Sequence, residues 1–277
     1  MILPRWRNKP AMNKVLILIA ICVLQFNALA QFSEPEFFNR VNKIYYALEL
    51  TDLNNFSSWV SSNIFEETVK DIYRDEIYPI EFLWVKPNDP YFIRRPLPPI
   101  QESLAAAKVK NGRDELQQGF RALIMDWGRF YAGRLLTHMP TDYTLETRAD
   151  TVLLNFKNYN DPRDSETNIF FGLNGHVLQT SVIYRDSSER INTFPKYKYT
   201  GEYWLCTGWR VQIFKKGEVI SGFQVKVISK RIEKYWLPSQ FQMELQNKDV
   251  RDKIFIRVYN FRNIRINRDI QVLNSGN

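Results

Sequence analysis

The sequence lacks most of the residues and motifs on which enzymes and metal proteins depend. Two cysteines and two histidines occur among 277 residues. No cysteine pair at zinc-binding spacing, His-Glu-x-x-His motif or glycine-rich phosphate loop is present. The Gly-x-Ser-x-Gly motif of many hydrolases is also missing. We therefore expect no enzymatic activity, no metal site and no cofactor. A Ser–His–acid triad stays open, because triads are defined by geometry.

The few reactive side chains have structural interpretations. His138 ends a predicted helix, where a cation suits the helix dipole, and His176 follows a predicted hairpin turn. Cys206 lies among tryptophans and a leucine, which favours a buried position. Since Cys22 belongs to the N-terminal segment described next, no intrachain disulfide is expected in the mature chain.

The N-terminus has the parts of a secretory signal peptide. Lys14 precedes an apolar run from Val15 to Leu24, and Ala28-Leu29-Ala30 supplies a small-x-small end. The run is about half of the roughly 20 residues that cross a bilayer as a helix, so a permanent anchor is not expected. Residues 1–30 are predicted to be a cleaved signal, with Met12 as an alternative start. The mature protein is then periplasmic or secreted.

The charge balance is only mildly basic. Residues 1–30 hold four basic side chains and no acidic one, so their removal lowers the net charge from +8 to +4. A nucleic-acid-binding protein usually shows a concentrated basic face, so no nucleic-acid partner is expected. Four arginines near the C-terminus are Arg257, Arg262, Arg265 and Arg268. Flanking aspartates favour a solvated strand face for them, and a weak attraction to anionic lipid headgroups stays open.

The first part of the mature chain has the apolar spacing of helices. A capping-box pattern at Ser33 and Glu36 predicts a helix from about Glu34 to Leu48. Asn63 is a candidate cap for a second helix that ends at Tyr73. The segment from Leu53 to Ile77 is therefore expected to be partly helical.

A proline-rich stretch separates a short strand from a long helical region. The apolar run from Ile80 to Val85 predicts the strand. Residues 87–99 are expected to be extended or looped because of their prolines. Residues 100–138 are predicted to be helical in two pieces, because Asn111-Gly112 is a break signal.

From Asp142 onward the apolar period changes to two, which predicts strands. Asn174-Gly175 predicts a type I′ hairpin turn, and Lys216-Gly217 predicts another turn. A last strand is expected from Ile254 to about Phe261. We therefore predict a single α+β domain over residues 31–277, helix-rich at 31–140 and with an antiparallel sheet at 141–277.

One face of the predicted sheet and one stripe of the predicted helices are strongly apolar. Two packings fit this pattern. In one, the helices cover the sheet and the core is filled. In the other, a curved antiparallel sheet, an incomplete β-barrel, is covered by a helical lid that encloses a hydrophobic cavity and hinges at Asn111-Gly112. The predicted cavity wall is Trp209, Val211, Ile213, Phe223, Val225, Val227, Phe241, Met243 and Leu245. The predicted lid is Phe120, Ile124 and Trp127.

Several short features follow one another in a suggestive order. After the signal and an amphipathic helix come Phe82-Leu83-Trp84-Val85-Lys86-Pro87 with Arg94, and later Trp236-Leu237-Pro238 before the alternating Phe241, Met243 and Leu245. In this order they resemble the periplasmic lipoprotein-carrier superfamily, which includes the LolA and LolB carriers. The resemblance implies an incomplete antiparallel barrel capped by helices, with acyl chains in the hollow and no covalent chemistry.

Two functional hypotheses follow. The first is a periplasmic carrier or binder of lipid or acylated ligands, such as lipoprotein acyl chains. The alternative is a secreted envelope structural or assembly module, which binds a protein partner through its edge strands or its proline-rich loop. A hydrolase is third. None of them requires an integral membrane span.

Overall fold

The computed structural model describes residues 33–87, 89–132, 136, 139–159, 161–246 and 254–269. The predicted signal, its alternative start Met12 and His138 lie outside the described residues. The described chain divides into two units after Phe38. Helix α2 (Glu34–Ile44) contains the boundary. At its start, the Ser33 backbone N donates to the Glu36 carboxylate at 3.1 Å, which is one arm of the predicted capping box.

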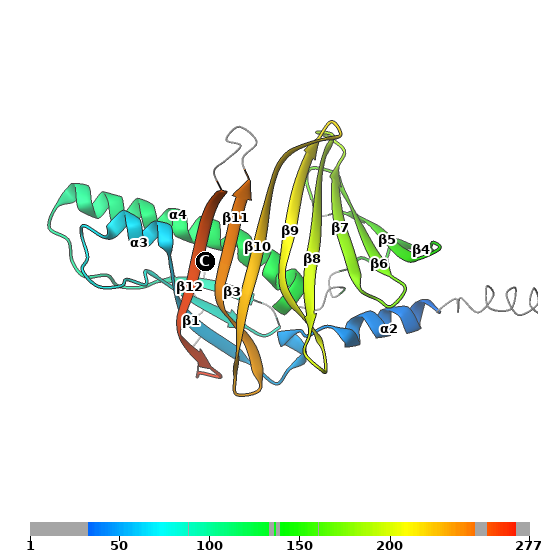
Figure 1. The fold of residues 1–277 in the computed structure, drawn as a ribbon, viewed down its shortest axis with the longest axis horizontal. Helices are drawn as coiled ribbons and strands as arrows, with labels where there is room; N and C mark the ends of the chain where they lie inside the picture. The colour runs from blue at the N-terminus through cyan, green and yellow to red at the C-terminus, as the bar shows by residue number, and fades with distance from the viewer. Residues whose placement is uncertain are drawn as a thin grey trace, which may run out of the picture. The chain divides into compact units, whose positions relative to one another are not determined.

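Residues 39–277 build an open, curved antiparallel sheet (Figure 1). Across the sheet the strands are, in order, β3 (Asp89–Arg94), β2 (Ile80–Val85), β1 (Asn55–Ser62), β12 (Ile254–Ile266), β11 (Tyr235–Gln246), β10 (Glu218–Ile232), β9 (Trp204–Lys215), β8 (Glu189–Tyr199), β7 (Val177–Tyr184), β6 (Ser165–Gly172), β5 (Thr151–Asn158) and β4 (Tyr143–Thr147). The predicted α+β class with an antiparallel sheet is confirmed at this level. Strand β12 pairs with β1, so the last strand of the described chain lies beside the first one.

Helical segments connect and cover these strands. Helix α3 (Asn63–Val69) and the long helix α4 (Ser103–Trp127) both lie in the chain between β1 and β4. A π-helical turn, η2 (Gly128–Ala132), continues α4, and a short 3-10 turn, η1 (Leu48–Leu50), precedes β1. In Figure 1, α4 passes behind β10, β11 and β12.

Alternation along the strands gives the sheet two faces. We call the face that packs against α4 the inner face and the opposite one the outer face. Phe82 of β2, Phe241 of β11 and Phe261 of β12 all lie on the inner face, and Phe120 of α4 contacts each of them. These rings belong to one hydrophobic cluster between α4 and the sheet.

Helix α4 corrects the prediction of two helical pieces. It runs without a break through Asn111-Gly112, so the predicted hinge is absent. The glycine has a packing role instead. A Cβ at Gly112 would lie 3.3 Å from side-chain atoms of both Phe65 and Thr68 in α3. The residue therefore allows the two helices to approach closely.

The earlier helices are shorter than predicted. Helix α2 ends at Ile44 rather than Leu48, and Tyr45 forms an isolated bridge with Trp204. Helix α3 ends at Val69 rather than Tyr73. Its cap is Ser62, whose Oγ accepts from the Phe65 backbone N at 3.2 Å, and not Asn63.

Strand boundaries show a mixed outcome. Strand β2 has the predicted bounds, whereas β1 occupies part of a segment expected to be helical. The last strand continues past Phe261 to Ile266. Both Lys216 and Gly217 have positive φ, at 51° and 86°, which fits the predicted turn. At Asn174-Gly175 only the glycine has positive φ, 86°, so this turn is not type I′.

Candidate functional site

Phe120 is the centre of contact between the predicted lid and the predicted wall. Its side chain is fully buried. The ring centroid lies 6.2 Å from that of Phe241 in the predicted wall, 5.5 Å from Phe261 and 5.5 Å from Tyr259. Aromatic pairs at such separations stabilise a contact beyond the area that they bury. The lid therefore rests directly on the sheet through its rings.

The C-terminal end of α4 is anchored in the same way. Trp127 stacks on Tyr131 of η2 at 5.4 Å and meets Phe56 of β1 at 6.2 Å. The Tyr131 hydroxyl donates to the backbone oxygen of Trp236 at 2.9 Å. The hydroxyl of Tyr46 accepts from the backbone N of Trp236, also at 2.9 Å. These contacts fix η2 and the segment after α2 to strand β11.

The predicted wall divides into a buried and a half-buried part. The buried residues of wall and lid are Trp209, Val211, Val225, Val227, Phe241, Phe120, Ile124 and Trp127. Ile213, Phe223, Met243 and Leu245 are half-buried. All of the buried ones belong to a single cluster. The structure therefore brings wall and lid together, and the contact between them is packed with side chains.

The half-buried wall residues continue into an apolar strip along the inner face, which we define as Ile213, Phe223, Met243, Leu245 and Phe255. Strand register places Phe223 opposite Leu245, and Leu245 opposite Phe255. Exposure rises along the strip, because Phe255 of β12 is 53% exposed. A row of apolar side chains thus leads from the filled core to solvent.

Phe255 was not among the residues predicted to form this surface. The signal was available, because Phe255, Arg257, Tyr259 and Phe261 alternate along the predicted last strand. The buried Phe261 fixes which face the whole set shares.

A carboxylate lies at the border of the cluster. Burial raises the pKa of Asp126 on α4, while the charge of Arg129 and the Trp209 indole oppose that rise. Nearby, burial raises the pKa of the Cys206 thiol to about 12. This thiol is therefore protonated at neutral pH and unsuited to act as a nucleophile. Its burial confirms the predicted core position.

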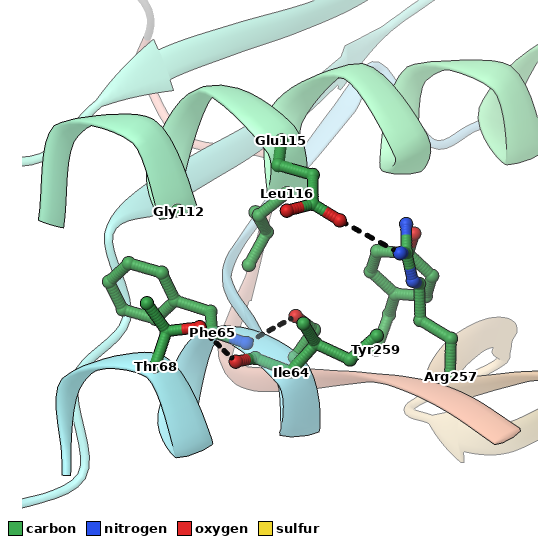
Figure 2. A pocket seen from close by; sticks show the side chains of 9 residues that line it. Ile64, Phe65, Thr68, Gly112, Glu115, Leu116, Arg257 and Tyr259 are labelled. Carbon is green, nitrogen blue, oxygen red and sulfur yellow. Dashed lines mark hydrogen bonds and ion pairs between the residues drawn. The ribbon is translucent and has the colours of Figure 1, made fainter. Parts of the chain in front are cut away.

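A smaller cleft lies between α3, α4 and β12 (Figure 2). Its cavity volume is about 10 Å³, close to the room that one water molecule needs. Arg257 donates from Nη2 to Glu115 Oε1 at 3.0 Å across the cleft. A Cβ at Gly119 would lie 2.6 Å from the Tyr259 hydroxyl and 2.8 Å from Arg257 Nη1. Glycine thus lets α4 sit close above these two side chains.

The cleft is small for a lipid. Ligand pockets usually enclose about 300–1,000 Å³, and an acyl chain does not fit in the space between α3 and α4. A solvated face was predicted for all four C-terminal arginines, and this prediction is wrong for Arg257. Arg257 is on the inner face and paired with Glu115, whereas Arg262, Arg265 and Arg268 are exposed.

His176 is held among aromatic residues. Its ring lies edge-on to Trp204 at 4.1 Å, and burial lowers its pKa. The neighbouring Tyr45 hydroxyl accepts from the Val177 backbone N at 2.6 Å and donates to the Gly175 oxygen at 3.0 Å. These contacts pin the β6–β7 turn to the segment after α2, which is a structural role.

Among the described residues, no group of three or more His, Cys, Asp or Glu side chains is arranged to hold a metal ion. Within the same residues, every helix is too short or too polar to span a membrane. A scan of family models finds no match, and no curated protein or solved structure matches the chain.

Proposed function

We propose that the protein is a non-catalytic binder of acyl chains, and that the apolar strip of the inner face holds the ligand. The strip joins four half-buried residues of the predicted wall to Phe255, which is 53% exposed. This run of accessible apolar surface is the observation that carries the proposal. A hydrocarbon chain that lies along the strip removes apolar surface of both partners from water, which favours binding.

The filled core beneath α4 is the floor of this site and not its cavity. Phe120 and Trp127 are fully buried there, so an acyl chain between lid and wall would have to displace them. The strip needs no such displacement. Burying about 200 Å² of apolar surface at about 25 cal/mol per Å² contributes roughly 5 kcal/mol before the cost of ordering the ligand.

The expected carrier role places this binding in the periplasm or outside the cell. Its supports are the signal-like sequence of residues 1–30 and the open antiparallel sheet with a long helix on one face. In this proposal the sheet acts as an incomplete barrel whose mouth is the strip. The cargo is a lipid or the acyl group of a lipoprotein.

Two neighbouring residues of β12 give a matched test. Phe255 is 53% exposed on the inner face and Ile256 is 52% exposed on the outer face. Titration of mature protein with a fluorescent fatty acid should show saturable binding. Phe255→Asn should weaken it several-fold, and Ile256→Asn should leave it unchanged. Native mass spectrometry of periplasmically expressed protein should show a co-purified lipid.

Three results would count against acyl binding. The first is the absence of both co-purified lipid and fatty-acid uptake. The second is an equal loss of fatty-acid affinity in the two variants, and the third is unchanged affinity in both. A change of secondary structure in Phe255→Asn would be detected by circular dichroism. In that case Leu245→Asn, at the paired position on β11, provides a second probe of the strip.

The second candidate function is an envelope assembly module that binds a protein. The observation that favours it is the open sheet, whose end strands in the described chain are β3 and β4. An edge strand can pair with an extended segment of another protein. Crosslinking in cells that yields one stable protein partner, together with no lipid, would favour this function over acyl binding.

A further inference from the structure

The outer face of the sheet carries a cluster of aromatic and cationic side chains. It lies on the side of the sheet opposite the apolar strip. Strands β3, β2, β1 and β12 lie side by side here. The register aligns Ile93, Glu81, Trp59 and Arg262 in one row across them. The next row is Tyr91, Leu83, Ser57 and Arg265. Both rows belong to the face opposite α4.

Two guanidinium groups lie at Trp59, and we call the three residues Trp59, Arg95 and Arg265 the arginine–tryptophan site. The Arg95 guanidinium carbon lies 3.6 Å from the centroid of the Trp59 ring, and that of Arg265 lies 6.0 Å from it. The backbone fixes Arg95, because its Nη1 donates to the Tyr78 oxygen at 2.8 Å. The Asn263 side-chain oxygen accepts from Arg265 Nε at 3.3 Å.

These two cations differ from the other arginines of the same face. Arg268 forms an ion pair with Glu81 at 3.1 Å, and Arg262 donates from Nε to the Tyr78 hydroxyl at 3.1 Å, with Glu76 and Glu66 near. Within the described part of the chain, no ion pair joins Arg95 or Arg265 to a carboxylate. Burial lowers the pKa of Arg95, Glu81 opposes this, and the charge of Arg265 lowers it further.

Arg95 and Arg265 lie near one another, and among the described residues neither has a carboxylate at ion-pair distance, while Glu81, whose charge acts on Arg95, is paired with Arg268. The two guanidinium groups are therefore a candidate site for an oxyanion. Guanidinium groups present planar forks of N–H donors that match phosphate and carboxylate oxygens. An anion between Arg95 and Arg265 would relieve the repulsion between them. Both groups are already held near an indole, so little side-chain freedom remains to be lost on binding.

We propose that the arginine–tryptophan site binds the phosphate of an anionic lipid headgroup and so docks this face of the sheet on a membrane surface. The neighbours favour a lipid source. Tyr91 is 45% exposed and Ile93 is 47% exposed on the same face, where both can enter the headgroup region. Tyrosine and tryptophan suit that region, because each has an apolar body and a polar tip. This inference does not depend on acyl binding at the inner face.

The test is co-sedimentation of the mature protein with vesicles. One set contains phosphatidylcholine alone, and the other contains equal parts of phosphatidylcholine and phosphatidylglycerol. We expect binding to the anionic set only, weakened by salt. The double variant Arg95→Gln/Arg265→Gln should lower that affinity by roughly ten- to thirty-fold.

Arg210→Gln is the matched control. Arg210 lies on the outer face over Phe194, with its guanidinium carbon 4.6 Å from the ring centroid, on β9, which β12, β11 and β10 separate from β1. The variant loses one positive charge and the same kind of contact, so it is compared directly with Arg265→Gln. Its vesicle binding should equal that of the unaltered protein. Arg265→Gln alone, at an exposed side chain, preserves the test if loss of Arg95 impairs folding.

Four outcomes would overturn the proposal. They are no binding to anionic vesicles, binding that the double variant leaves unchanged, and equal loss in Arg210→Gln and the double variant. The fourth is binding of inorganic phosphate or an acidic peptide, measured by calorimetry, by protein that does not bind anionic vesicles. Failure of fatty-acid uptake with intact vesicle binding would reject the acyl proposal alone.

Discussion

The inner face of the sheet has two regions, one that helix α4 covers and one that it leaves accessible. Under α4, the row that contains Phe241 and Tyr259 is fully buried by rings such as Phe120. Farther along the same strands, the row of Phe223, Leu245 and Phe255 passes from half-buried at the first two residues to exposed at Phe255. Residue type is similar in the two rows. The helix above them therefore decides whether an aromatic residue stabilises the fold or remains available to a ligand.

The largest expected effect separates these two regions by stability. Phe120→Ala should lower the free energy of unfolding by about 3–5 kcal/mol, because it removes a fully buried ring and leaves a cavity. Phe255→Ala should change it by no more than about 0.5 kcal/mol, since that side chain is 53% exposed. Urea denaturation of both variants measures the difference. Similar losses would show that the two regions are equally covered.

A smaller effect tests how closely α4 approaches the sheet. Gly119→Ala gains about 1 kcal/mol of helix propensity, but its Cβ would lie 2.6 Å from the Tyr259 hydroxyl. Overpacking of this kind costs about 1–3 kcal/mol. We therefore expect a net loss of roughly 1 kcal/mol in urea denaturation.

Tyr259→Phe provides the check on that interpretation. Tyr259 is fully buried, and its hydroxyl is the atom that a new Cβ at Gly119 would meet first. The double variant Gly119→Ala/Tyr259→Phe should recover part of the loss, and the coupling in the double-mutant cycle should be favourable. Strictly additive effects would mean that the helix stands farther from β12 than the structure shows.

The sequence predicted elements well where a single local rule decides them. Strand β2 was predicted with its correct bounds, because an apolar run between prolines has few alternatives. The Lys216-Gly217 turn followed from the glycine. Strand β1 was missed, because seven of its eight residues are buried and it lacks the alternation of a strand with one wet face.

Other errors came from packing between distant segments. Gly112 was a break signal in the sequence but serves the contact between α4 and α3 in the structure. The last strand extends to Ile266 past Asn263, whose φ of 51° accompanies a register shift against β1. A bulge of this kind depends on the partner strand, so local pattern does not reveal it.

Part of the candidate site was also predictable from a local rule, the alternation of side chains along a strand. Alternation correctly assigned Trp209, Val225 and Phe241 to one apolar face that meets α4. A period of two tells which residues share a face, but not how far a helix extends across it. The division between a packed core and an accessible strip, and the inclusion of Phe255, therefore required the three-dimensional arrangement.

The smallest expected effect concerns the charge at the border of the covered region. Because burial raises the folded-state pKa of Asp126, the folded protein retains a proton at pH values where the unfolded chain has lost it. The contribution of Asp126 to the free energy of unfolding therefore falls as the pH rises from the unfolded-state pKa of about 3.9 through the folded-state pKa. Asp126→Asn removes the ionisation, so the variant should be slightly more stable than the original protein at pH 7.

This gain should disappear as the pH falls below about 4, where the unaltered carboxyl is neutral in both states. Urea denaturation across that range measures it, with the exposed Asp75→Asn as the control. A variant less stable at pH 7 than at pH 4, relative to the original protein, would mean that Arg129 and Trp209 stabilise the carboxylate more than burial penalises it. Burial beneath α4 would then not exclude an ionised side chain from the border of the covered region.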